Sequence, residues 1–338
     1  MIIFFIDNKS VLRKFTCILL AISMLIFIKE PVGAENTQPQ LHAVAAALYD
    51  ADNGTTIYSK NANESMANAS TTKILTCIVA LENASLEDTV TATAEAAAQP
   101  QVKLGLKEGQ SYNMKDLMYG MMLESYNDCA YAIAEHVGGS VEGFAKLLNQ
   151  KANAIGCYGT YFLTPNGLDK EDDISFHHTT ANDLCLIMAY CAWNSPKSAD
   201  FLAITQTMEY QYSDESGQKN FKNHNRLLSE TDYAVSGKTG FTTKAGYCYV
   251  AAIEKDGRKM CLSLLGCGWP NNKNYKWEDA KKLVEYGTGV KDSFSTAVSE
   301  NIAGTENATE NKTENKVKNK NILPDFANYF TINIGFFY

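Results

Sequence analysis

The sequence predicts an α+β fold in which an antiparallel sheet, built from both ends of the chain, is flanked by helices. Two hairpin patterns support this prediction. Apolar runs at 42–49 and 247–253 are each followed by a turn and a second run that can pair back. Between them, apolar residues recur at helical spacing. Strands at both ends and helices in the middle fold most simply as one sheet with helices packed around it.

The turns and periodicities locate the elements in order along the chain. The first hairpin turns at Asp50–Gly54 and returns over 55–58. Lys238–Gly246 leads into the second hairpin, which turns at Asp256-Gly257 and returns over 260–265. Helices are expected over residues 70–81, 114–124, 128–137, 141–155, 180–193 and 277–286.

Composition and charge are those of a globular, acidic protein. The 338 residues are 45% hydrophobic and 20% charged. Lys and Arg number 30 against 38 Asp and Glu, which gives a net charge of −8. A general nucleic-acid binder needs a basic face, so no nucleic-acid partner is expected.

The first 34 residues have the pattern of a secretory signal peptide. Lys9, Arg13 and Lys14 precede an apolar run over 15–28, and small residues follow at Val32–Ala34. The run is shorter than the roughly 20 residues that a membrane span needs, although an uncleaved anchor is the alternative. We therefore expect a secreted, extracytoplasmic protein, at the cell wall or the outer face of the cytoplasmic membrane.

The rest of the chain divides into a domain at 35–290 and a tail at 291–338. Residues 301–321 are rich in Asn, Glu, Lys and Thr, with few apolar side chains to offset the entropy of ordering. We expect a low-complexity, disordered tail. The aromatic residues that follow it are a candidate for weak contact with a membrane surface.

The cysteines and histidines do not form a metal-binding pattern. Nine cysteines are present, no CxxC pair occurs, and Cys17 lies in the predicted signal peptide. Several of the other eight stand in apolar patterns, where a free thiol packs as a small hydrophobic group; disulfides are the alternative. His177-His178 has no acidic partner at metal-ligand spacing, so a structural loop is expected. No metal or cofactor is predicted.

Three short motifs carry the chemistry. Ser70-Thr71-Thr72-Lys73 opens an apolar helix, and residues three apart share one helix face. At the helix N-terminus, free N–H groups favour developing negative charge, and Lys73 is within reach of the Ser70 hydroxyl as a base. Ser125-Tyr126-Asn127 lies between two helices, and Lys238-Thr239-Gly240 enters the second hairpin. Each motif alone is common, but the ordered triple is specific.

The longer stretches around the motifs resemble the low-molecular-mass penicillin-binding proteins, and more narrowly the serine-type D-alanyl-D-alanine carboxypeptidases. These stretches are Leu123–Ala130, Thr164–Asp169, Gly237–Thr242 and Ala245–Tyr247. The resemblance covers about residues 36–290. It implies a β-lactamase/transpeptidase-like fold, with the antiparallel sheet flanked by helices and an all-helical lobe beside it.

The resemblance implies an acyl-enzyme mechanism. Ser70 would attack the carbonyl between the two D-alanines of a peptidoglycan stem peptide, and Lys73 would take its proton. Lys73 must then be neutral at some stage, so its pKa has to fall from about 10.4. Burial and the positive charge of Lys238 both lower it. Ser125 would relay a proton, and Asn127 would hold Lys73 and the substrate amide.

The same resemblance assigns the third motif to the substrate carboxylate. Lys238 and Thr239 would bind it, and Gly240 would let the backbones approach. The backbone N–H groups of Ser70 and Phe241 would form the oxyanion hole. β-Lactams, which mimic D-Ala-D-Ala, would act as covalent inhibitors. A second basic residue near the carboxylate is expected at either of two positions, His224 or Arg226.

Three other functions stay open on the sequence. A β-lactamase on the same fold needs a deacylating carboxylate, and no E-x-x-L-N motif occurs between Ser125 and Lys238. A D,D-endopeptidase would use the same residues on crosslinks. A non-catalytic cell-wall binding module would be favoured by loss of Ser70, Lys73 or Lys238, and all three are present.

Overall fold

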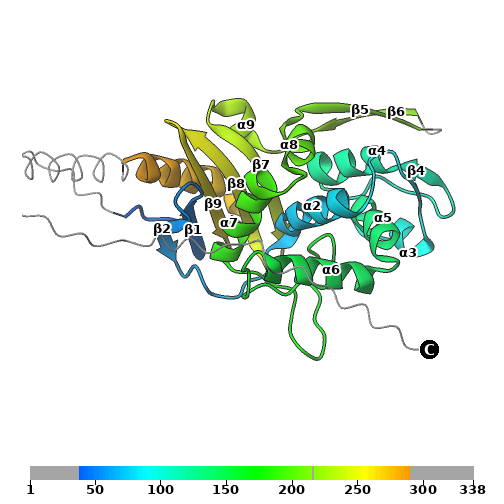
Figure 1. Cartoon of the computed structure of the whole chain (residues 1–338), viewed down its shortest axis with the longest axis horizontal. Helices are drawn as coiled ribbons and strands as arrows, with labels where there is room; N and C mark the ends of the chain where they lie inside the picture. The colour runs from blue at the N-terminus through cyan, green and yellow to red at the C-terminus, as the bar shows by residue number, and fades with distance from the viewer. Residues whose placement is uncertain (1–37, 215–216, 290–338) are drawn as a thin grey trace, which may run out of the picture. The chain divides into compact units, whose positions relative to one another are not determined.

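The central sheet has five antiparallel strands in the order β2-β1-β9-β8-β7 (Figure 1). This computed structural model describes residues 38–214 and 217–289, so the predicted segments 1–34 and 291–338 lie outside the described residues. The strands are β1 (Ala45–Asp50), β2 (Thr55–Lys60), β7 (Ala234–Thr242), β8 (Gly246–Lys255) and β9 (Arg258–Leu265). Because β1 pairs directly with β9, the predicted sheet built from both ends of the chain is confirmed.

Two tight hairpins form the halves of this sheet. In the first, the Asp50 carboxylate accepts hydrogen bonds from the backbone N–H groups of Asp52 and Asn53, each at 3.1 Å. In the second, Asp256 and Gly257 have φ angles of 52° and 68°. Positive φ at both central residues matches the twist of the flanking strands. Both turns lie where the sequence predicts them.

Helices cover both faces of the sheet. A C-terminal helix over residues 275–289, orange in Figure 1, buries Leu283 and Val284 against one face. On the other face, α7 (Ala181–Ala189) packs against β1, β8 and β9. The interior strand β8 is therefore buried on both sides, which explains its almost unbroken apolar run.

A mainly helical lobe lies beside the sheet. Its helices are α2 (Lys73–Asn83), α3 (Ala94–Ala97), α4 (Met114–Tyr119), α5 (Asn127–Gly138) and α6 (Val141–Ala154). Ile78, Ile133 and Phe144 are fully buried within it. The lobe also carries a short two-stranded sheet of β3 (Thr89–Thr91) and β4 (Ser111–Asn113). The predicted helices at 114–124 and 180–193 each end in a π-helical turn, η2 (Gly120–Glu124) and η3 (Tyr190–Asn194).

Some elements were not predicted from the sequence. They are α8 (Ser198–Gln206), the hairpin β5 (Glu209–Asp214) with β6 (Gly217–Lys222), and α9 (Arg226–Glu230). The hairpin residues are mostly exposed, and of the described ones only Tyr212 and Phe221 are buried. Since little of the hairpin contacts a core, its sequence lacks the apolar alternation that marks a half-buried strand.

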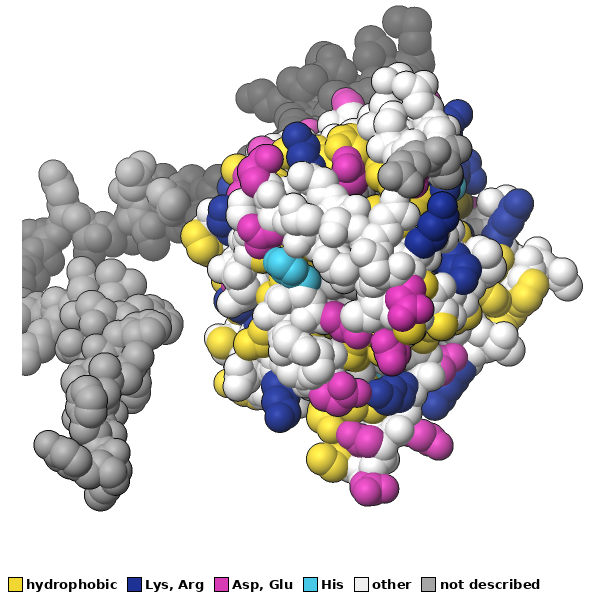
Figure 2. Space-filling view, turned by 90° about the vertical axis from the view of Figure 1, so that its right-hand side faces the viewer, with side chains coloured by type: hydrophobic (Ala, Val, Ile, Leu, Met, Phe, Trp, Pro, Cys, Tyr) yellow, Lys and Arg dark blue, Asp and Glu magenta, His cyan; other side chains and the backbone are white. Residues whose placement is uncertain are grey.

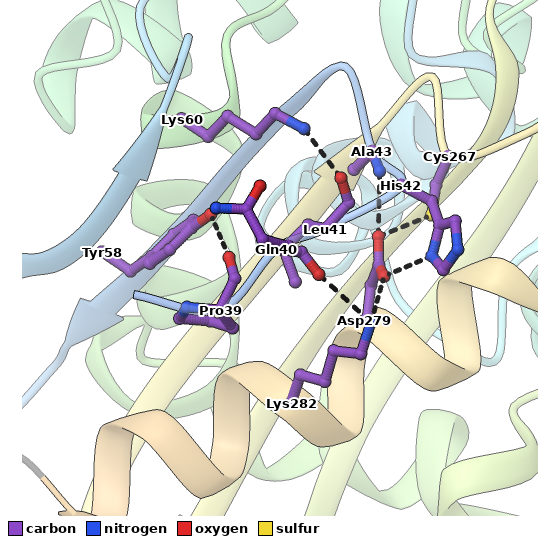
Figure 3. Close-up of polar contacts among 10 residues, drawn as sticks. All are labelled: Pro39, Gln40, Leu41, His42, Ala43, Tyr58, Lys60, Cys267, Asp279 and Lys282. Carbon is purple, nitrogen blue, oxygen red and sulfur yellow. Dashed lines mark hydrogen bonds and ion pairs between the residues drawn. The ribbon is translucent and has the colours of Figure 1, made fainter. Parts of the chain in front are cut away.

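The segment 39–43 is fastened to the C-terminal helix (Figure 3). The fully buried Asp279 carboxylate accepts the backbone N–H of Ala43 at 2.9 Å and lies 2.9 Å from Nδ1 of His42. The His42 ring also stacks on Tyr275, with 3.8 Å between centroids. These contacts fix the first turns of the helix.

The eight cysteines of the described chain are buried and unpaired, which confirms the expectation of free thiols. Cys185, for example, donates from its thiol to the backbone oxygen of Cys261 at 3.3 Å. Burial raises the pKa of both thiols. They therefore pack as small hydrophobic groups.

The face of the molecule shown in Figure 2 has no dominant charge. Figure 2 views the molecule from the right-hand side of Figure 1, and acidic side chains on that face are interspersed with lysines and arginines.

Among residues 38–214 and 217–289, no helix is both long and apolar enough to cross a membrane.

Candidate active site

Ser70 lies at the entrance to the helical lobe. It is part of the 3-10 turn η1 (Ala69–Thr72), which runs directly into α2. The sequence predicts Ser70 at the first turn of an α-helix, whereas the α-helix begins at Lys73. Ala69 has a φ of 49°, a strained value for a residue with a side chain. The chain therefore turns sharply just before the hydroxyl.

Lys73 connects the first two motifs. Its Nζ lies 2.9 Å from each of three acceptors: Ser70 Oγ, Asn127 Oδ1 and the backbone oxygen of Asn166. The side chain is fully buried. Burial, and next the positive charge of Lys238, hold the pKa of Lys73 well below its usual range. The neutral amine can donate to the two amide oxygens while its lone pair accepts the Ser70 proton.

Ser125 and Asn127 come from the turn between η2 and α5. Ser125 has the left-handed φ of 66°, which ends one helix and allows the next to begin. Its buried Oγ has no hydrogen-bond partner among the described residues. Asn127 opens α5 and accepts a hydrogen bond from Lys73 Nζ at its Oδ1, while its side-chain NH₂ donates to the oxygen of Pro100 at 3.2 Å.

The third motif lies on β7, the edge strand of the sheet. A Cβ on Gly240 would lie 2.7 Å from the Ser70 backbone nitrogen, closer than real structures tolerate. Glycine is therefore what allows β7 to approach the nucleophile. Lys238 is 4% exposed, and burial lowers its pKa to about 7, opposed by the negative charge of Glu124. Its Nζ donates to the Thr239 oxygen at 3.1 Å.

The predicted residues meet at one cleft of about 550 Å³. Those that line it directly are Ser70, Ser125, Lys238, Thr239, Gly240 and Phe241. Lys73 and Asn127 lie beneath it and reach it through Ser70. Further lining residues lie outside the three short motifs: Gln101, Val102, Glu124, His224, Tyr247, Lys276 and Trp277.

The structure separates the two basic candidates. His224 lines the cleft, with its Nε2 2.9 Å from Glu124 Oε2. Arg226 instead pairs with Glu230, 2.6 Å away, and covers the Trp277 ring at 5.6 Å. Of the two, His224 is the basic side chain available to a ligand in the cleft.

Lys276 is a cleft cation that the motifs do not reveal. It stands in the first turn of the C-terminal helix, with its Nζ 4.4 Å from the Tyr247 ring centroid and 4.9 Å from that of Trp277. Burial lowers its pKa to about 8. A single lysine before a helix carries no sequence signal, and only the folding of that helix onto the sheet brings it to the cleft.

The two adjacent histidines are structural, as expected. His177 is buried and hydrogen-bonded to Thr72 and Leu163, and His178 contacts the backbone oxygen of Phe176. Within the described ranges, no three His, Cys, Asp or Glu side chains gather as a metal site would require.

Comparison with known proteins identifies the family of this chain. A family model for D-alanyl-D-alanine carboxypeptidases, peptidase family S11, matches residues 33–267. The chain belongs to the D-alanyl-D-alanine carboxypeptidase family. It is thus a serine peptidase, a hydrolase of the penicillin-binding protein class with a cell-wall function, and the predicted family and fold are confirmed.

Relatives and solved structures agree with this assignment. The chain is 30% identical to the D-alanyl-D-alanine carboxypeptidase DacF of Bacillus subtilis, over 78% of this chain and 68% of the relative. It is also 30% identical to the D-alanyl-D-alanine carboxypeptidase DacB2 of Mycobacterium tuberculosis, over 73% of this chain and 82% of the relative. A crystal structure of a D-alanyl-D-alanine carboxypeptidase from Mycobacterium tuberculosis superposes with a TM-score of 0.68 at 28% identity, covering 74% of this chain and 92% of that one.

Proposed function

We propose that this carboxypeptidase removes the terminal D-alanine of peptidoglycan stem peptides through an acyl-enzyme on Ser70. The observation that carries the proposal is the 2.9 Å contact between Lys73 Nζ and Ser70 Oγ in a buried site. A hydroxyl needs an adjacent base to become a nucleophile. A lysine can serve only when neutral, and burial favours the neutral form.

Acylation follows from this pair. The neutral Lys73 amine takes the Ser70 proton as Oγ attacks the carbonyl between the two D-alanines. Negative charge then develops on the carbonyl oxygen, within reach of the backbone N–H groups of Ser70 and Phe241. The close packing of Gly240 against the Ser70 nitrogen brings β7 near η1, so the two N–H groups can face the same oxygen.

The basic side chains of the cleft would hold the terminal carboxylate. Lys238, Lys276 and His224 all line the cleft, with Thr239 as a hydroxyl donor beside them. The free edge of β7 offers backbone groups to an extended peptide. Together these groups favour a peptide that ends in a free carboxylate just beyond the scissile bond.

Acylation is completed by a proton for the leaving amine, and deacylation then needs an activated water. Ser125 has a buried hydroxyl with no partner among the described residues, and both it and Lys238 line the cleft. We assign Ser125 the relay of a proton to the departing D-alanine. The neutral Lys73 would then activate the water that releases the acyl group.

The same chemistry would make β-lactams covalent inhibitors. One solved neighbour is penicillin-binding protein D2 of Listeria monocytogenes in its cefotaxime-bound form, with a TM-score of 0.63 and 27% identity. The acidic side chain that lines the present cleft, Glu124, is held by His224 and by the Lys222 backbone N–H at 2.7 Å. A carboxylate held in this way is not placed to activate water, which argues against a β-lactamase.

We further propose that the enzyme acts outside the cytoplasmic membrane, where peptidoglycan lies. The sequence pattern of residues 1–34, which is typical of a signal peptide, supports this part of the proposal. Fusing them to a phosphatase that is active only after export tests this part of the proposal. Activity in the fusion supports export, and its absence contradicts it.

The activity is tested with a purified pentapeptide that ends in D-Ala-D-Ala. Release of free D-alanine by the wild type, and none by a folded Ser70→Ala variant, is the expected result. A peptide ending in L-Ala-L-Ala is the matched control and should stay intact. Cleavage that persists in Ser70→Ala would overturn the assignment of the nucleophile.

A further inference from the structure

His177 joins two segments that both touch the nucleophile, yet no step of the proposed reaction uses it. The side chain is 3% exposed and stacks on Phe162, with 4.7 Å between ring centroids. Its Nδ1 accepts the backbone N–H of Leu163 at 3.0 Å, and its Nε2 lies 2.9 Å from Thr72 Oγ1. The ring thus bridges from the 163–167 segment to η1.

The hydrogen bonds fix the tautomer of this ring. A backbone N–H can only donate, so Nδ1 carries no proton and Nε2–H donates to Thr72. The Thr72 hydroxyl in turn donates to the Ala69 oxygen at 2.9 Å and accepts from Asn68 Nδ2 at 2.9 Å. Burial lowers the pKa of His177 to about 3, so the ring stays neutral and this network persists over the working pH range.

Both bridged segments position the reacting atoms. The η1 turn carries Ser70. The 163–167 segment carries Asn166, whose backbone oxygen accepts from Lys73 Nζ at 2.9 Å and from Ser70 Oγ at 3.4 Å. The two segments are in close contact, because a Cβ on Gly167 would lie 1.8 Å from a backbone oxygen of η1. A shift of one segment therefore moves the nucleophile relative to its base.

We propose that His177 is a positioning residue for acylation, a neutral brace that holds η1 against the 163–167 segment so that Ser70, Lys73 and the Asn166 oxygen keep their geometry. The proposal rests on the function proposed above. The proposed carboxylate-binding groups lie on β7, on the loop before α9 and on the C-terminal helix, whereas the His177 ring is hydrogen-bonded to Thr72 and Leu163. Its loss should therefore slow acylation and leave KM nearly unchanged.

Two variants each remove one of the two hydrogen bonds that the His177 ring makes. His177→Asn keeps an oxygen near the position of Nδ1, which preserves the bond to Leu163 and removes the one to Thr72. His177→Gln keeps an N–H donor near the position of Nε2 and removes the acceptor for Leu163. His178→Asn is the matched control, because the neighbouring ring contacts Phe176 instead.

The rate of acylation is measured by stopped flow with a chromogenic β-lactam. KM and kcat are measured from the release of D-alanine, and folding is checked by circular dichroism. A misplacement of reacting groups by about 1 Å costs about 100-fold in rate. We expect both His177 variants to acylate about 10- to 100-fold more slowly with KM within about twofold, and His178→Asn to match the wild type.

Wild-type acylation in a folded His177 variant would overturn the proposal, as would an equal loss in His178→Asn. If the His177 variants do not fold, Thr72→Val removes the other end of the brace without changing side-chain shape. It should then show the same slow acylation, and a wild-type rate would again refute the role. A wild type that neither is acylated nor releases D-alanine instead refutes the proposed function, so the two failures are distinguishable.

Discussion

The affinity of the cleft for a substrate carboxylate should fall as the pH rises through neutrality. Lys238 is buried in the cleft, and burial lowers the pKa of its ammonium to about 7. A lysine is charged below its pKa and neutral above it. The charge that attracts the carboxylate is therefore present in mild acid and is lost as the pH rises through 7.

The size of the effect follows from this pKa. The charged fraction of Lys238 falls from about nine-tenths at about pH 6 to about one-tenth at about pH 8. If the charged form alone binds the carboxylate, KM rises about tenfold, equivalent to about 1.4 kcal/mol. Lys276, whose pKa is lowered to about 8, extends the rise to higher pH.

Initial rates of D-alanine release across this pH range give KM and kcat at each pH. Glu124→Gln removes the negative charge that opposes the lowering of the Lys238 pKa, so the rise in KM should move to lower pH. Lys281→Gln removes an exposed lysine that pairs with Glu230 outside the cleft, and it should leave the profile unchanged. A KM that is constant from about pH 6 to about pH 8, in an enzyme that still releases D-alanine, would refute the reasoning.

Four further outcomes are expected. Ser70→Ala should lower kcat by at least about 10⁴-fold with the melting temperature retained, as measured by D-alanine release and circular dichroism; near-wild-type turnover would exclude Ser70. Lys238→Ala should raise KM more than Lys73→Ala does, while Lys73→Ala mainly slows acylation; equal effects on both constants would reject the division of roles. Gly240→Ala, which forces a Cβ to within 2.7 Å of the Ser70 nitrogen, should lower kcat/KM about 10- to 100-fold through the cost of overpacking, and an unchanged value would show that β7 can move away. Penicillin should leave a covalent adduct on the peptide carrying Ser70, visible by intact-mass spectrometry for minutes or longer, and rapid hydrolysis without an adduct would indicate a β-lactamase.

The sequence alone determined the features that depend on neighbours along the chain. The hairpin turns at Asp50 and Asp256 follow from local turn chemistry, and the long helices follow from apolar periodicity. Ser70 and Lys73 meet because residues three apart lie on the same side of the 3-10 turn that leads into α2, and their contact is 2.9 Å. The ordered motifs then predicted which residues gather at the cleft.

The tertiary structure alone decided which residues without a motif join them. Lys276, His224 and the Asn166 oxygen come from a helix, a loop and a turn that are distant in sequence, and no local pattern distinguishes His224 from Arg226. The helix over 275–289 brings Lys276 to the cleft by burying its apolar face on the sheet. Burial also sets the charge of Lys73 and Lys238, because the cost of desolvating an ammonium depends on every segment packed around it and not on its own neighbours in the chain.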